Sequence, residues 1–126
     1  MKREFVTTLN CIDGRVQLPV IQWIMDNNNV KYTDMITLPG MDGILADKNS
    51  DILDILEKIN VSRNVHLTDQ IFIVGHHDCL ANPVNDETHK KQVIKSVNRI
   101  KGHNPSCNVT GLWVDSNSQV QVVYES

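Results

Sequence analysis

The sequence predicts an α/β protein: a three-layer sandwich around a mostly parallel central sheet of about four to five strands, with an antiparallel edge strand at the C-terminus. Two observations support this fold class. Short apolar segments alternate with longer segments of helical periodicity along the chain, and such alternation builds right-handed βαβ units with parallel strands. The last two apolar segments are separated only by the polar residues 115–118, which turn the chain back. We expect one domain over residues 1–126, a length that can bury its own core.

The first half of the chain predicts two strands and two helices. Residues 5–10 predict a strand that ends at Cys11, and residues 16–28 a helix, because Pro19 is tolerated in a first helical turn. Residues 32–38 predict the second strand, closed by a Pro-Gly pair. Residues 49–60 predict an amphipathic helix. Its predicted apolar face consists of Ile52, Leu53, Ile55, Leu56 and Ile59.

The second half predicts the centre of the sheet and its C-terminal edge. Residues 71–75 are wholly apolar, as expected of a strand covered on both faces. The next helix has Asn85 as its N-cap and Gly102 as its stop. Residues 109–114 and 119–124 predict the last two strands. The predicted buried stripe of the long helix consists of Val93, Ile94, Val97 and Ile100.

Composition excludes several functions. A formal net charge of -3 and scattered cations argue against a nucleic-acid partner. The longest apolar runs are only a few residues, too short to span a membrane. The N-terminal segment lacks the apolar run of a secretion signal, so we expect a cytoplasmic protein. Three cysteines are an odd number, which argues against a closed disulfide framework.

Three side chains form a candidate zinc site. Cys11 follows one predicted strand, and His76 and Cys79 follow another. Ligands of open α/β sheets bind beyond the carboxyl ends of the strands, where the strand order reverses. The three side chains therefore converge if these two strands are neighbours. Zinc accepts thiolate and imidazole ligands, and a site with three protein ligands leaves one position open for water, whose pKa falls to about 7.

Asp13 and Arg15 form the second informative pair. An aspartate two residues beyond a thiolate ligand can accept a hydrogen bond from metal-bound water or bind the metal itself. Arg15 can hold that carboxylate in a bidentate fork and keep it ionised. The alternative is a salt bridge that only holds the turn. We favour the catalytic interpretation because perturbed ion pairs near metals are often functional.

The motifs at residues 11–15, Cys-Ile-Asp-Gly-Arg, and 76–79, His-His-Asp-Cys, resemble the Cys-x-Asp-Ser-Arg and His-x-x-Cys motifs of β-class carbonic anhydrases. Residues 34–40 resemble that family's second strand and the glycine-containing loop beside its substrate pocket. Residues 109–123 resemble its closing strands. The resemblance covers most of the chain, which is much shorter than typical members of that family.

The resemblance implies zinc held by Cys11, His76 and Cys79, with Asp13 and Arg15 as the catalytic pair. It implies a lyase that reversibly hydrates carbon dioxide to bicarbonate by attack of zinc-bound hydroxide. The resemblance also implies that Gly40 lies in the substrate pocket. Because family sites usually lie at a dimer interface, a homodimer or a larger homo-oligomer is also implied.

Several alternatives remain open at this stage. Gly14 stands where the family usually has Ser, Leu80 stands where Gly commonly follows the last ligand, and the family's Asn-Ala-Gly signature is absent. Related sites hydrolyse carbonyl sulfide or carbon disulfide, and a non-catalytic zinc protein is a third interpretation. Outside the motifs, we assign no role to His89, expected on a solvated helix face, or to Cys107, expected as a buried thiol.

Overall fold

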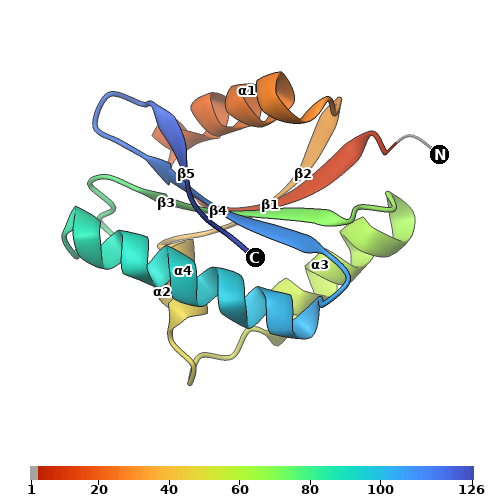
Figure 1. The fold of residues 1–126 in the computed structure, drawn as a ribbon. Coiled ribbons are helices and arrows are strands. Elements are labelled where there is room, and N and C mark those ends of the chain that lie inside the picture. The colour runs from red at the N-terminus through yellow and green to blue at the C-terminus, as the bar shows by residue number, and fades with distance from the viewer. Residues whose placement is uncertain (1–2) are drawn as a thin grey trace.

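Five strands form one sheet in the order β2-β1-β3-β4-β5 within residues 3–126, the part of the chain that the computed structural model describes (Figure 1). Residues 1 and 2, which belong to the predicted domain and to the N-terminal segment considered for a secretion signal, lie outside this range. The strands are β1 (Phe5–Cys11), β2 (Tyr32–Leu38), β3 (Gln70–His76), β4 (Asn108–Val114) and β5 (Val120–Glu125). The helices are η1 (Gly14–Val16, a 3-10 turn), α1 (Gln17–Asn28), α2 (Met41–Ala46), α3 (Leu53–Val65) and α4 (Asp86–His103).

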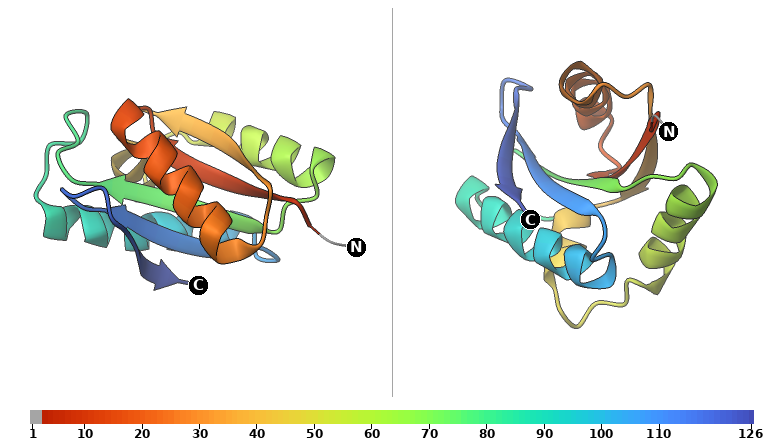
Figure 2. Two further views of the ribbon diagram at one scale, coloured as in Figure 1. Left: turned by 90° about the horizontal axis from the view of Figure 1, so that it is seen from above. Right: turned by 45° about the vertical axis from the view of Figure 1, so that its right-hand side comes forward.

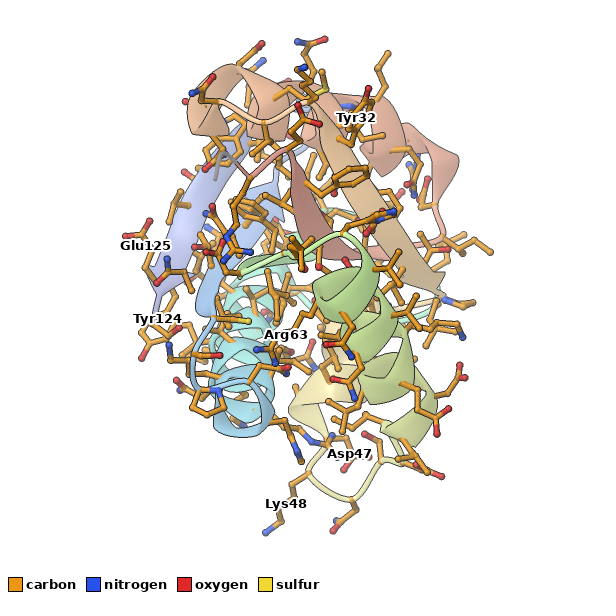
Figure 3. All side chains as sticks on the ribbon, turned by 90° about the vertical axis from the view of Figure 1, so that its right-hand side faces the viewer. Tyr32, Asp47, Lys48, Arg63, Tyr124 and Glu125 are labelled. Atoms are coloured by element: carbon orange, nitrogen blue, oxygen red, sulfur yellow. The ribbon has the colours of Figure 1, made fainter. Side chains whose placement is uncertain are left out.

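The strand pairing confirms the predicted fold class. β1 pairs in parallel with both β2 and β3, and β3 pairs in parallel with β4. β5 runs antiparallel to β4 at the edge of the sheet, with a register shift between Gly111 and Leu112. In Figure 3 the labelled side chains of Tyr124 and Glu125 lie on this edge strand. The chain therefore passes from β1 to β2, which lies on one side of β1 in the sheet. It then returns to β3, which lies on the other side of β1.

Helices cover both faces of the sheet and make the three predicted layers (Figure 2). α1 lies alone on one face, where Val20 and Ile24 pack against Phe72 and Val74 of β3 in one core cluster. α2, α3 and α4 share the other face, where their apolar side chains form the larger cluster. None of the helices in residues 3–126 is long and apolar enough to cross a membrane.

The structure corrects three details of the prediction. The helix expected at 49–60 begins at Leu53 and ends at Val65, because Asp51 accepts a hydrogen bond from the backbone of Leu53 and starts the helix late. Leu53 is 62% exposed, so it does not belong to the apolar face.

Asn85 caps α4 as predicted, accepting from the backbone of Thr88 at 2.8 Å. Gly102 does not stop that helix, which continues to His103.

Helix α2 was absent from the sequence prediction. It has only six residues, including Gly43, and follows β2 after a single Pro-Gly turn. Isolated helices of this length are unstable, so α2 depends on tertiary contacts. Met41 and Leu45 are fully buried in the large core cluster, and α4 packs beside them. The loop after α2 lies at the surface, where Asp47 and Lys48 are exposed and Lys48 points away from the protein (Figure 3).

Candidate metal centre

The candidate ligands lie where the strand order reverses. Cys11 is the last residue of β1 and His76 the last residue of β3, and these two strands are parallel neighbours. Their carboxyl ends therefore lie at the same edge of the sheet, at the point where the connections diverge to β2 and β4. Cys79 follows three residues after His76, in the loop that leads away from β3. The expected convergence of these strand ends is present.

The three side chains are close together and buried. One candidate ligand atom from each of Cys11, His76 and Cys79 lies within 4.8 Å of the others. The two sulfur atoms are 3.9 Å apart. The three residues are 4%, 3% and 4% exposed, respectively. This arrangement is compact enough for a single ion to contact all three.

The protonation pattern of His76 suits a metal ligand. Its Nδ1 lies 2.8 Å from the carbonyl oxygen of His77, so Nδ1 carries the proton and donates. Its Nε2 is buried and has no hydrogen-bond partner within residues 3–126. A buried nitrogen without a partner is costly, and metal-binding histidines commonly orient one ring nitrogen in this way. The donor set and the orphaned nitrogen therefore fit a zinc ion.

The thiols also favour a cation. Burial raises the pKa of the Cys79 thiol, and the neighbouring Cys11 raises it further. A divalent cation reverses that balance because it stabilises the thiolate form of its ligands. The backbone N–H of Gly40 points to the Cys11 sulfur at 3.5 Å. Its donation stabilises negative charge on that sulfur.

Asp13 and Arg15 are joined directly beside these ligands. Asp13 caps the 3-10 turn η1, where its Oδ1 accepts from the backbone N–H of Arg15 at 2.9 Å. The Arg15 guanidinium donates to both carboxylate oxygens, with a shortest distance of 2.6 Å. It also donates to the backbone oxygen of Asp78 at 3.1 Å, in the loop between His76 and Cys79. Arg15 therefore links the two motifs.

These hydrogen bonds control the charge of Asp13. Donation from Arg15 lowers the pKa of the Asp13 carboxyl from 3.8 to about 2, against a smaller opposing effect of burial. The same contacts raise the pKa of Arg15 further above its already high value. The carboxylate therefore stays ionised and accepts hydrogen bonds at every physiological pH.

A pocket of about 210 Å³ opens at this point, lined by Cys11, Ile12, Asp13, Pro39, Cys79, Leu80 and Ala81. Two thiols and one carboxylate are thus reached through a mouth with apolar side chains. Gly40 is absent from this lining. It lines a neighbouring pocket of about 280 Å³ together with Pro39 and Ala81, so its contact with the site is the N–H directed at Cys11.

A family model described as "Putative carbonic anhydrase" matches residues 1–124. The chain belongs to this carbonic anhydrase family. A search of curated proteins finds no match. Among solved structures, the chain is similar to β-carbonic anhydrase isoform I of Trichomonas vaginalis, with 17% identity and a TM-score of 0.62 over 96% of this chain and 82% of the other.

Two further carbonic anhydrases have the same fold. The enzyme of Streptococcus mutans is 15% identical, with a TM-score of 0.66 over 98% of this chain and 82% of the other. A structure from Sordaria macrospora, described as tetrameric β-carbonic anhydrase, is 10% identical, with a TM-score of 0.69 over 99% and 84%. The sequence-based recognition of the β-carbonic anhydrase family is confirmed.

Sequence reasoning missed two residues that shape the first motif of this chain. Asn10 is fully buried; its side-chain oxygen accepts from the backbone of Cys11 at 2.8 Å and its amide donates to Val16. The Gln17 amide donates to the backbone oxygens of Cys11 at 2.7 Å and Asp13 at 3.0 Å. Together they fix the turn that carries the Cys and Asp side chains. A polar residue inside an otherwise apolar strand end was the available signal for Asn10.

The histidines outside the ligand set divide into two kinds. His77 is 45% exposed and pairs with Asp86 at 3.0 Å, as a loop histidine does. His89 contradicts the prediction of a solvated position because it is 1% exposed. It lies four residues before Val93, on the buried stripe of α4, and that spacing was the signal for its burial. Cys107 is a buried thiol as predicted, at 1% exposure.

Proposed function

We propose that this chain is a zinc-dependent carbonic anhydrase, a lyase that reversibly hydrates carbon dioxide to bicarbonate. The supporting observation is the convergence of two buried thiols and an unpartnered imidazole nitrogen beside an ionised carboxylate at a solvent-accessible pocket. Membership of the carbonic anhydrase family supports the same reaction. Neither a structural thiol pair nor a simple salt bridge requires all of these groups in one place.

In this proposal Cys11, His76 and Cys79 hold the zinc ion. Two sulfur ligands and one nitrogen ligand match the preferences of zinc. When bound with one open position, zinc supplies a water whose pKa is near 7 and a Lewis acid for the substrate. The chain's own contribution is to hold the three ligands together in a buried place.

Asp13 accepts a hydrogen bond from the reacting water and so orients it toward carbon dioxide. Arg15 keeps the carboxylate ionised and fixed, because it donates to both oxygens. That engagement favours the acceptor role over direct metal binding by Asp13, since a carboxylate already clamped by a guanidinium is less free to turn. Arg15 is therefore a positioning residue and Asp13 the catalytic one.

The pocket walls suit a small apolar substrate. Ile12, Pro39, Leu80 and Ala81 line the pocket together with the candidate ligands Cys11 and Cys79, and none of these four residues carries a charge. Carbon dioxide has no net charge and needs little hydrogen bonding in the ground state. The same walls suit carbonyl sulfide and carbon disulfide, which makes hydrolysis of these molecules the second candidate function. Release of sulfide distinguishes it.

We also propose that the chain acts as a homodimer or a larger homo-oligomer in the cytoplasm. Ile12, Leu18 and Leu80 are 60%, 72% and 85% exposed in a single chain, and Ile12 and Leu80 form the mouth of the pocket. A second copy that covers them removes apolar surface from water. The three cysteines are free thiols, which suits a reducing compartment.

The decisive experiment is stopped-flow hydration of carbon dioxide by protein of measured zinc content, from neutral to alkaline pH. We expect a rate that rises through one ionisation, as for a metal-bound water that loses a proton. Absence of hydration at every pH in fully zinc-loaded protein would contradict the proposal. Sulfide production from carbonyl sulfide under the same conditions would then support the second candidate.

A further inference from the structure

A polar cluster with two buried and two half-buried members lies behind the candidate metal centre, on the face of the sheet covered by α2 and α4. It consists of Asp42 from the first turn of α2, Asn82 from the loop after Cys79, and His89 and Gln92 from α4. We call these four residues the Asp42 cluster. None of them is a candidate zinc ligand, and none lines the pocket that contains Cys11 and Cys79.

The Asp42 cluster is tightly hydrogen-bonded. His89 Nδ1 and Asp42 Oδ2 are 2.6 Å apart, with side chains only 1% and 3% exposed. The Asn82 amide lies 3.1 Å from Asp42 Oδ1 and 2.7 Å from Gln92 Oε1. A buried carboxylate is costly unless its oxygens are satisfied. Here both oxygens of Asp42 are engaged, whereas His89 Nε2 is buried without a partner in the described residues.

The cluster connects directly to the loop of Cys79. The backbone N–H of Asn82 donates to the backbone oxygen of Cys79 at 3.2 Å and closes a turn around that residue. The side chain of Asn82 then attaches this turn to α2 and α4. Because both the backbone and the side chain of Asn82 are hydrogen-bonded, the position of Cys79 depends on the cluster as well as on β3.

The cluster also reaches the other thiol through α2. Asp42 lies two residues after Gly40, whose N–H faces the Cys11 sulfur at 3.5 Å. Gly40 has a φ of 66°, and a Cβ there would lie 3.1 Å from the backbone oxygen of Ala81. The turn before α2 and the loop of Cys79 therefore pack backbone against backbone. A shift of α2 would alter the surroundings of both sulfurs.

We infer that Asp42, Asn82 and His89 are positioning residues that hold the Cys79 loop and the Gly40 amide in place for the two thiolate ligands. This inference rests on the proposed zinc site but not on the proposed reaction. Groups that orient metal ligands from behind commonly change metal affinity by about 10–100-fold. Retention of metal is therefore the property that the Asp42 cluster controls.

Two substitutions break the cluster in different ways. Asn82→Ala removes the amide that joins the loop to α2 and α4. Gly43→Ala removes no polar group, but its Cβ would lie 2.8 Å from Cγ and Nδ2 of Asn82 and would displace that amide. If both act through the amide, the double variant behaves like Asn82→Ala alone. Gly43→Ala also places a better helix former in α2, so it keeps the test available if Asn82→Ala fails to fold.

The control is Ser62→Ala. Ser62 is 4% exposed and makes buried hydrogen bonds, but to Thr7, Asp34 and Thr68 and not to the cluster. Its loss perturbs a buried polar network of similar kind without touching the Cys79 loop. A general loss of stability will therefore appear in all variants, and a specific effect on the metal only in the first two.

The experiment measures zinc release to a chromophoric chelator and the thiolate-to-metal absorption of the cobalt-substituted protein. We expect zinc release to be at least about tenfold faster in Asn82→Ala and Gly43→Ala, with a shifted absorption band, and unchanged in Ser62→Ala. Wild-type release and absorption in both cluster variants would overturn the inference. A protein that binds zinc as expected yet hydrates no carbon dioxide would contradict the proposed reaction alone, since neither readout depends on turnover.

Discussion

The sulfur atoms of Cys11 and Cys79 lie 3.9 Å apart, although 68 positions separate the two residues in the chain. The parallel pairing of β1 with β3 brings them together, because each cysteine lies at or just beyond a carboxyl end at the same edge of the sheet. Both are free thiols. The sheet therefore supplies, without a covalent bond, the close approach that a shared ion requires.

Replacing a candidate ligand will remove the metal. In Cys79→Ala we expect zinc affinity to fall by more than the roughly 10–100-fold typical of groups that only orient ligands, because a direct bond is lost. Zinc content after dialysis, measured by mass spectrometry, checks this. Cys107→Ala is the matched control, since Cys107 is equally buried but lies outside the ligand group. A fully loaded Cys79→Ala protein would exclude Cys79 as a ligand.

Neutralising Asp13 will separate metal binding from activity. We expect Asp13→Asn to keep its zinc and to lose about 10²–10⁴-fold in the rate of carbon dioxide hydration, the usual range for a positioned proton acceptor. Stopped-flow rates per bound zinc check this. Asp26→Asn, on the exposed surface of α1 and bonded to Gln22, is the control for charge alone. Equal rates in the two variants would remove Asp13 from the mechanism.

The charge of Asp13 will depend on Arg15. The carboxyl pKa is lowered from 3.8 to about 2, chiefly by donation from Arg15. A lowered pKa contributes stability that is fully present above pH 3.8 and is lost as the pH falls through about 2. In Arg15→Gln we expect the pKa of Asp13 to rise toward 3.8, as followed by carboxyl NMR. An unchanged titration would show that Arg15 does not control this group.

The backbone at Gly40 will not accept a side chain. Its φ of 66° and the 3.1 Å approach of a Cβ to Ala81 predict that Gly40→Ala destabilises the fold, by about 1–2 kcal/mol for the left-handed conformation alone. Denaturant unfolding measures the loss. Gly14→Ala is the control, because a Cβ at Gly14 meets nothing within 4 Å. Equal stability of the two variants would contradict this account.

A charge at the mouth of the pocket will weaken self-association. Leu80 is 85% exposed, and Leu80→Lys would place an ammonium group in the proposed contact between copies. We expect the assembly to dissociate at concentrations where the native chain stays associated, as measured by sedimentation. Leu53→Lys, at another exposed leucine of 62% exposure on α3, is the control. Equal association of all three proteins would place the interface elsewhere.

The sequence was informative where local pattern decides structure. The apolar runs and their spacing predicted the strands, and the polar cap Asn85 predicted the start of α4. Helix α2 could not be predicted, because six residues with a central glycine form a helix only against α4 and the sheet. The start of α3 was placed too early because the predicted helix included the polar residues 49–51, which the structure places in a turn before the helix.

The candidate site shows the same contrast between what local sequence patterns predict and what only tertiary contacts decide. Order and spacing of the two motifs identified Cys11, His76 and Cys79 as a group, and the sheet topology brings them together. The pair of Asp42 and His89 could not be derived, because its members lie 47 positions apart and neither belongs to a motif. The Gly14 departure is also clarified: the open space at that position would accommodate a serine side chain, so packing does not require glycine there.

The separation of the two cysteines along the chain has a consequence for folding. An ion shared by Cys11 and Cys79 closes a loop spanning 68 positions, more than half of the 126-residue chain, and loop closure in an unfolded chain carries an entropic cost. A bound ion would therefore act as a cross-link that is available mainly to the folded state. At a free zinc concentration a hundred times the dissociation constant, it would add about 2.7 kcal/mol to the free energy of unfolding. The lifetime of the protein in a cell would then follow the zinc supply, independently of how fast it turns over its substrate.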